Sequence, residues 1–124
     1  MTRHDFTLTT DGSGAATVFS ADPAHGEIRQ IRYVPGGTPL DTGADLTVTG
    51  EGSGLVLATL TDIGTSAVQW APRQATHSTA GAASLYAAGG TAVTDRIGIA
   101  NERIKVVVAQ GGATKTSTLH VWVG

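Results

Sequence analysis

The chain has 124 residues, with 8 Lys or Arg against 10 Asp or Glu, a formal net charge of −2 and no cysteine. This length corresponds to about one domain, and the missing cysteines exclude disulfides and thiolate metal sites. The near-neutral charge argues against a nucleic-acid binder, which usually carries a strongly basic face. No run of about 20 apolar residues and no signal-peptide order occur, so we expect no membrane contact and synthesis in a cytoplasm.

The first predicted elements form a hairpin over residues 3–20. Phe6–Thr9 and Ala16–Ser20 are short strand patterns, and Asp11–Gly14 between them is a strong turn sequence. Residues 27–34 form the next predicted strand, and its apolar residues fall on both faces. Such mixed patterning is typical of an edge strand or of a strand that changes sheet at a bulge.

The middle of the chain predicts a second hairpin. Residues 45–50 alternate with Leu46 and Val48 on the inward face, and residues 55–60 are apolar enough for a central strand. A short strand over 67–71 precedes Pro72. The Ala-rich stretch from 78 to 90 is compatible with about two turns of helix or with an ordered loop over the sheet.

The last 28 residues predict three strands in a row, at 97–99, 103–109 and 118–123. Ile104, Val106 and Val108 share one face of the second strand, and Leu119 and its alternate neighbours share one face of the third. The glycines at 111–112 predict a turn that pairs these two strands as a hairpin.

About nine short strands with Gly-rich turns favour an all-β fold, an antiparallel β-sandwich or small barrel. We expect a single domain over 1–124, with the N-terminal hairpin at 3–20 and the main β body at 27–124. Charged residues make up only 15% of the chain, below the roughly 25% typical of soluble domains. This deficit suggests that a partner covers part of the surface.

The sequence contains no residue pattern typical of a catalytic or metal-binding site. The histidines at 4, 25, 77 and 120 are scattered, whereas zinc ligands usually include close pairs. Ser78, His77 and Asp95 could be drawn as a triad, but no nucleophile-elbow pattern surrounds the serine. The acidic residues near turns lack EF-hand spacing, and the Gly-rich turns lack the lysine of a phosphate loop. We therefore expect no enzyme activity, no catalytic residues, no cofactor and no metal.

Most of the chain, from Glu27 to Gly124, resembles a family of small virion structural proteins of tailed bacteriophages. The likeness is carried by Pro72–Gly90, Asp95–Ile97, Glu102–Val107 and Gly111–Val121, and upstream by Ile31–Val34 and Asp45–Glu51. The resemblance implies a part of a virus particle, assembled in the bacterial host cytoplasm. It implies no particular position in the particle and no catalytic residues.

The favoured hypothesis is a capsid decoration (cement) protein that binds the head surface as a symmetric homo-oligomer. Its expected partners are copies of itself and other virion proteins, above all the major capsid protein, with no nucleic acid and no membrane. The alternatives are a neck or tail component at the head–tail joint, and a carbohydrate-binding β-sandwich on the particle surface. The residues expected at interfaces are Trp70, Arg73, His77, Ala83, Leu85, Tyr86, His120 and Trp122.

Overall fold

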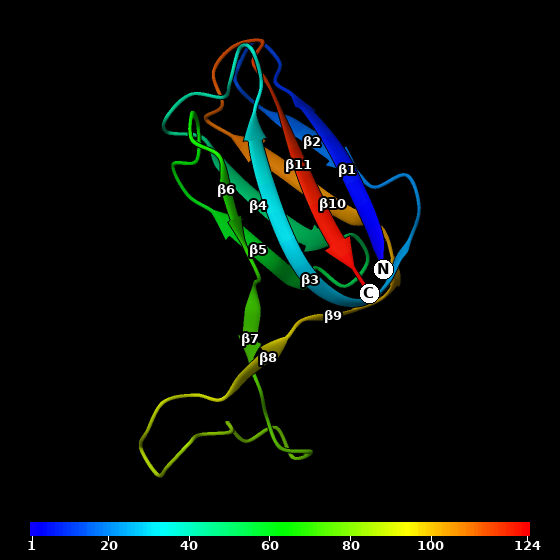
Figure 1. Cartoon of the computed structure of the whole chain (residues 1–124), viewed down its shortest axis with the longest axis vertical. Coiled ribbons are helices and arrows are strands. Elements are labelled where there is room, and N and C mark those ends of the chain that lie inside the picture. Colours follow the sequence, from blue (N-terminus) through cyan, green and yellow to red (C-terminus); the bar gives the residue numbers. More distant parts are fainter.

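The computed structural model describes all residues, 1–124, and contains strands but no helix. Two antiparallel sheets pack face to face, and a small two-stranded ribbon projects from them (Figure 1). The expected all-β, antiparallel sandwich is therefore confirmed, with 11 strands where about nine were expected. They are β1 (Thr2–Thr9), β2 (Ala16–Phe19), β3 (Ala24–Pro35), β4 (Asp45–Gly50), β5 (Val56–Leu60), β6 (Val68–Trp70), β7 (Arg73–Ala75), β8 (Thr94–Arg96), β9 (Gly98–Glu102), β10 (Ile104–Ala109) and β11 (Thr116–Val123).

The strand order shows that most sheet neighbours lie far apart in the chain. One sheet has the order β1-β11-β3-β6, with β9 also paired to β3, and the facing sheet has the order β2-β10-β4-β5. The pairing of β1 with β11 places Thr2 opposite Val123, so the two ends of the chain lie side by side (Figure 1). All pairings are antiparallel, yet only β4–β5 and β7–β8 join consecutive strands.

Two expected hairpins are wrong. Strands β10 and β11 lie in different sheets, and so do β1 and β2, which were expected to pair within residues 3–20. The apolar faces of β10 and β11 were assigned correctly, but they meet across the core because the strands belong to opposite layers. The connection after β10 crosses between the layers and is held to the β1–β2 turn, where Gly111 N donates to Gly14 O at 2.9 Å.

Strand position within the sheets also departs from expectation. Strand β5, expected in the middle, is the last strand of its sheet, and β3 pairs on both sides and is therefore not an edge strand. The predicted irregularity in β3 is confirmed, because its register against β11 shifts between Trp122 and Val123. The shift lets Ile28 and Ile31, on opposite faces by simple alternation, both become buried.

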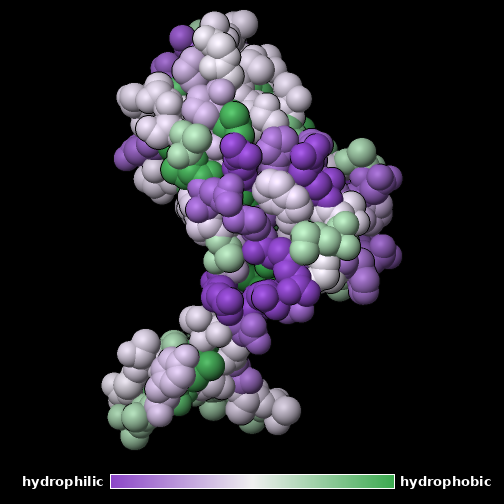
Figure 2. All heavy atoms as spheres, in the orientation of Figure 1, coloured by the Kyte–Doolittle hydropathy of each residue, from purple (hydrophilic) through white to green (hydrophobic).

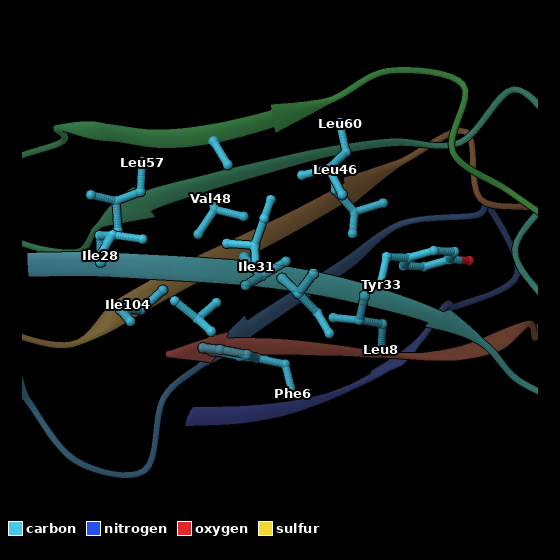
Figure 3. Close-up of a cluster of buried hydrophobic side chains, with 14 of the residues drawn as sticks. Phe6, Leu8, Ile28, Ile31, Tyr33, Leu46, Val48, Leu57, Leu60 and Ile104 are labelled. Carbon is cyan, nitrogen blue, oxygen red and sulfur yellow. The ribbon is translucent and has the colours of Figure 1, made fainter. Parts of the chain in front are cut away.

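The core between the sheets is one cluster of 22 buried hydrophobic residues (Figure 3). Ile104, Val106, Leu119 and Val121 are each fully buried within it, as their alternation predicted. Burying an aliphatic side chain of this size contributes about 1.5–3 kcal/mol. The largest buried residue is Tyr33, and no buried side-chain polar atom lacks a hydrogen-bond partner.

Candidate interaction surfaces

Residues 73–96 form an arm that leaves the sandwich beside β6. Its stem is the ribbon of β7 and β8, in which Arg73 pairs with Arg96 and Ala75 pairs with Thr94. Arg73 Nη1 lies 3.9 Å from Asp95 Oδ1 across the stem. Pro72 and Ile97, which flank the arm, are both buried. The arm is therefore anchored at its root, and its tip lies away from the body (Figure 1).

Two tight turns build the tip in place of a helix. Ser78 N donates to Ala82 O at 2.8 Å, and Tyr86 N donates to Thr91 O at 3.0 Å, which closes one turn each. Gly81 and Gly89 have φ angles of +83° and +69°, a region that glycine enters at little cost. The helical alternative for 78–89 is thus wrong, and the ordered-loop alternative is confirmed, although the loop does not lie over the sheet.

Backbone hydrogen bonds join the two turns into one unit. Thr76 N donates to Val93 O at 2.9 Å, Val93 N donates to Ser84 O at 2.9 Å, and Ser84 N donates to Thr76 O at 3.0 Å. Three chain segments therefore meet at one point without a buried side chain between them. The tip owes its shape to main-chain pairing and not to a core of its own.

The arm is exposed but uncharged. Residues 74–94 contain no Asp, Glu, Lys or Arg, and no residue from 73 to 96 is buried. Leu85 is 41% exposed and Tyr86 is 75% exposed. In Figure 2 the arm is a white and green lobe, set apart from the body by hydrophilic residues at its root. An exposed, uncharged lobe with free apolar side chains is typical of an interaction surface.

A groove of about 390 Å³, here called the root groove, lies between the β5 edge and the arm's root. Six of its 10 lining residues are hydrophobic, and they include Val56, Leu57, Trp70 and Ile97. Val56 is 52% exposed, and Arg73 is the only charged residue in the lining. The groove was missed at the sequence level because residues 55–60 were expected to be a covered, central strand.

A cluster of polar and aromatic side chains lies on the outer face of the β1–β11 pair. Asp5 and His120 are register partners, and Asp5 Oδ1 lies 2.6 Å from His120 Nδ1 and 2.8 Å from Arg3 Nε. The hydrogen bond with His120, followed by the contact with Arg3, lowers the pKa of the Asp5 carboxyl. The rings of His120 and Trp122 lie 5.9 Å apart. This cluster is a polar, partly aromatic face on a rigid strand pair.

A second hollow of about 510 Å³ lies among the loops at the end of the sandwich that holds Gln110. Only one of its eight lining residues is hydrophobic, and Asp41 and Lys115 are the charged ones. These two residues form none of the ion pairs in the structure. The hollow offers hydrogen-bonding groups but brings no acid and base into contact.

The residues considered for catalysis are engaged elsewhere. Ser78 Oγ accepts hydrogen bonds from Ala80 N and Ala82 N at 3.3 and 3.2 Å, so it closes the first turn of the tip. Asp95 accepts from the amide of Arg96 at 2.7 Å. The backbone of His77 forms an isolated β-bridge with that of Ala83, and its imidazole is not hydrogen-bonded to Ser78 or Asp95. No group of three or more His, Asp or Glu side chains converges closely enough to hold a metal ion.

The residues expected at interfaces fall into three places. Arg73, His77, Ala83, Leu85 and Tyr86 belong to the arm, and Trp70 lines the root groove. His120 and Trp122 lie on the outer face of β11. Trp70 is the register partner of buried Ile31, whereas Trp122 is the partner of Gln30 on the other face of the same sheet. The two tryptophans therefore lie on opposite faces of this sheet.

No protein-family model matches the chain, and no curated protein matches it. Among solved structures, it is similar to an exo-beta-1,3-galactanase from Phanerochaete chrysosporium, crystallised with galactose, at 12% identity and a TM-score of 0.32. The match covers 98% of this chain and 27% of that chain, so this chain spans about a quarter of the enzyme's length. A likeness this weak supports no conclusion about the function of this chain. The structure has no helix long and apolar enough to cross a membrane.

Proposed function

We propose that this protein is a non-enzymatic structural component of a bacteriophage virion, a decoration protein that binds the capsid surface as a symmetric oligomer. The observation that carries the proposal is the arm, a 24-residue projection from 73 to 96 in which no residue is buried. Ordering the backbone of each residue costs about 1–2 kcal/mol. An exposed projection recovers little of that cost until another surface covers it.

The sequence resemblance supplies the biological setting of this proposal. The stretch that carries most of the likeness to phage virion proteins, Pro72–Gly90, forms most of the arm. A rigid sandwich with a projecting arm suits a shell component, because symmetric repetition multiplies a modest contact. The expected partners are further copies of the chain and the major capsid protein.

The absence of an assembled acid–base site supports a non-enzymatic role. Ser78 and Asp95 bond to neighbouring backbone and to the arm stem, and neither is hydrogen-bonded to His77, which is the strand-register partner of Ala83. A nucleophile needs its base within hydrogen-bond reach. Asp5 and His120 lie 2.6 Å apart, but no hydroxyl is hydrogen-bonded to His120 as a nucleophile would be, and the pair lies on an open strand face.

Copy number in purified virions tests the proposal. A decoration protein is expected in a fixed ratio to the major capsid subunits by quantitative mass spectrometry, and on the outer head surface in an electron-microscopy map. A small copy number equal to one ring would instead support a neck or tail component. Absence from virions would reject both.

Carbohydrate binding is the second candidate, and the Trp122–His120 face favours it over the other aromatic positions. A tilted pair of rings beside a carboxylate provides both an apolar surface and hydrogen-bond acceptors. A glycan array with the intact protein and with Trp122→Ala tests it. Binding that is lost in Trp122→Ala supports the idea, and an array without any bound glycan rejects it.

A further inference from the structure

The sheet that contains β11 presents two neighbouring rows of side chains on its outer face. Their neighbours along the strands, such as Phe6, Ile31 and Val121, are buried, so these side chains point away from the core. Direct register partners have Cβ atoms about 4.5–5.5 Å apart, which brings each row within reach of one small ligand. The first row consists of Asp5, His120, Arg32 and Gln69, and the second of Arg3, Trp122 and Gln30; we call these seven residues the outer β11 face.

This face carries an excess of positive charge in a chain whose formal net charge is −2. Its two arginines and one aspartate give +1 with His120 neutral. Asp5 Oδ1 lies 2.8 Å from Arg3 Nε, so the charge of Arg3 is compensated. Arg32 is exposed and forms none of the ion pairs in the structure. The face therefore offers one uncompensated guanidinium, whose planar fork of N–H donors matches a carboxylate.

His120, the register partner of Arg32, is held in one orientation by Asp5. The Asp5 carboxylate lies 2.6 Å from His120 Nδ1, and because an ionised carboxylate only accepts hydrogen bonds, Nδ1 carries the proton. Nδ1 is the ring atom that this contact engages, so Nε2 remains available to a hydroxyl of a ligand. The row thus places a carboxylate-binding group beside a hydroxyl-binding group on a hydrogen-bonded strand pair.

Trp122 adds an apolar surface to these polar groups. Its ring is half-buried and lies 5.9 Å from the His120 ring, at an angle of 51°. An indole combines a flat apolar face with a polar edge, which suits the C–H face of a sugar ring. Gln30 is the register partner of Trp122, and Gln69 is that of Arg32. Their amides both donate and accept hydrogen bonds, as sugar hydroxyls do.

We propose that the outer β11 face binds a uronic-acid residue of a polysaccharide, with the sugar carboxylate on Arg32 and the sugar ring against Trp122. A nucleic acid requires a series of cations along its backbone, whereas this face has one uncompensated cation among amides, an imidazole and an indole. The inference goes beyond the proposed structural role. It rests on the carbohydrate-binding alternative, to which it adds the class of sugar and the residue that selects it.

The test measures binding of the full-length protein to immobilised polygalacturonate, alginate and hyaluronan, each beside its carboxyl-reduced form, in which the uronate has become a neutral sugar. We expect binding to at least one of the three. Binding to its carboxyl-reduced form should be weaker by at least about tenfold, because the charge-assisted hydrogen bonds to Arg32 are lost. Absence of binding to all three, or equal binding to the reduced forms, would overturn the proposal.

Two arginine variants separate a specific site from general charge attraction. Arg32→Gln should weaken uronate binding by at least about tenfold and leave any binding to the carboxyl-reduced form unchanged. Arg96→Gln is the matched control, because Arg96 is also exposed, forms none of the ion pairs and lies on the arm stem. Circular dichroism verifies that both variants fold. An equal loss in the two variants, or equally tight binding of the unmodified protein to polyglutamate, would also overturn the proposal.

Failure of this inference is distinguishable from failure of the proposed function. A protein found on virions in a fixed ratio that binds no uronate retains its structural role but loses the glycan site. Uronate binding that depends on Arg32, by a protein absent from virions, retains the site but removes the role. Binding that is lost in Trp122→Ala but does not distinguish acidic from reduced polysaccharide leaves the carbohydrate-binding alternative and overturns the acidic ligand.

Discussion

Tyr33 ties the core to the loops at one end of the sandwich. Its hydroxyl donates to Gly64 O at 2.6 Å and lies 2.8 Å from Ser117 Oγ, which itself accepts long hydrogen bonds from two backbone amides. The single phenol hydrogen goes to the carbonyl, which can only accept, so Ser117 donates in return. Burial raises the pKa of the Tyr33 phenol, so this side chain stays protonated and can donate its hydrogen bond.

Tyr33→Phe should destabilise the protein by about 1–3 kcal/mol, because Gly64 O and Ser117 Oγ lose a buried partner. Urea unfolding measures the change in the free energy of unfolding. Tyr86→Phe is the matched control, since Tyr86 is 75% exposed and surface substitutions usually stay within about 0.5 kcal/mol. Equal stabilities for the two variants would contradict this account of Tyr33.

Val18 and Phe19 are adjacent apolar residues of β2, and their side chains point to opposite faces of the strand. Val18 packs against the core, and Phe19 faces outward with 37% exposure. The guanidinium carbon of Arg103 lies 4.5 Å from the Phe19 ring centroid. Arg103 also donates two hydrogen bonds of 2.6 Å to Glu51, which lowers the pKa of Glu51 and raises that of Arg103.

At the scale of elements, strand pairing is the feature that distinguishes this fold from a meander. Strand β11 lies between β1 and β3, and β10 lies between β2 and β4. The last two strands thus join the two N-terminal strands to the rest of each sheet. This arrangement is dominated by contacts between residues distant in sequence, which favours slow folding.

A disulfide test distinguishes the observed pairing from a C-terminal hairpin. Thr7 and Thr118 are register partners of β1 and β11, so Thr7→Cys/Thr118→Cys should form a disulfide. Closing so long a loop stabilises by up to about 5 kcal/mol, measured as the difference in unfolding between oxidised and reduced protein. Val107→Cys/Thr118→Cys joins strands of opposite sheets and should stay reduced. A disulfide in this second pair would support the hairpin instead.

We expect that the body does not need the arm for its own stability, because no residue from 73 to 96 is buried. Replacing residues 74–95 by an Asn-Gly turn should change the free energy of unfolding by less than about 1 kcal/mol, because no buried side chain is removed. Ile97→Ala at the root is the control and should cost about 2–5 kcal/mol, since Ile97 is buried at 3% exposure. Unfolding of the armless variant under native conditions would show that the arm supports the body.

At the scale of the whole molecule, four carboxylates tie loops and strand faces together. The pKa of each lies below its ordinary value: Asp5 through His120, Asp11 through the amide of Ala15, Glu51 through Arg103, and Glu102 through the amide of Ser53. Glu102 Oε1 accepts from Gly52 N and Ser53 N at 3.0 Å each. It therefore closes the β4–β5 turn from β9.

A lowered carboxyl pKa contributes stability that is present above the unfolded value and is lost as pH falls through the folded value. Unfolding free energy should thus decrease below about pH 4.5, near the ordinary Glu value. Glu102→Gln should lower stability at neutral pH and reduce the loss on acidification. Asp22→Asn, at a carboxylate without a hydrogen bond, should leave the acid loss intact. An identical pH profile for Glu102→Gln and the unmodified protein would contradict this role.

Assembly should depend on the arm tip more than on the sandwich. Leu85→Asp or Ala83→Glu is expected to weaken the oligomer, measured as a lower mass by light scattering, while the melting temperature of the chain stays nearly unchanged. Both positions are exposed, so a new charge costs little until a partner covers it. Thr17→Asp on exposed β2 is the control and should leave the oligomer intact. An unchanged mass for both arm variants would exclude the tip from the interface.

The sequence alone determined the all-β class, the inward-facing residues and the segment that differs from the rest. Alternation of apolar residues is a local property, and it correctly assigned Val106 and Leu119 to the core. The uncharged run from 74 to 94 is also readable from the sequence and points to the arm. Of the residues expected at interfaces, five lie on that arm.

Only the tertiary structure decided which strands pair and where the groove lies. Alternation gives the buried face of a strand but not its neighbour, so β10 and β11 looked like a hairpin although they face each other across the core. The same ambiguity placed residues 55–60 in the middle of a sheet instead of at its edge. Pairing is selected by the packing of all strands at once, because each inward face must find a partner in the opposite layer.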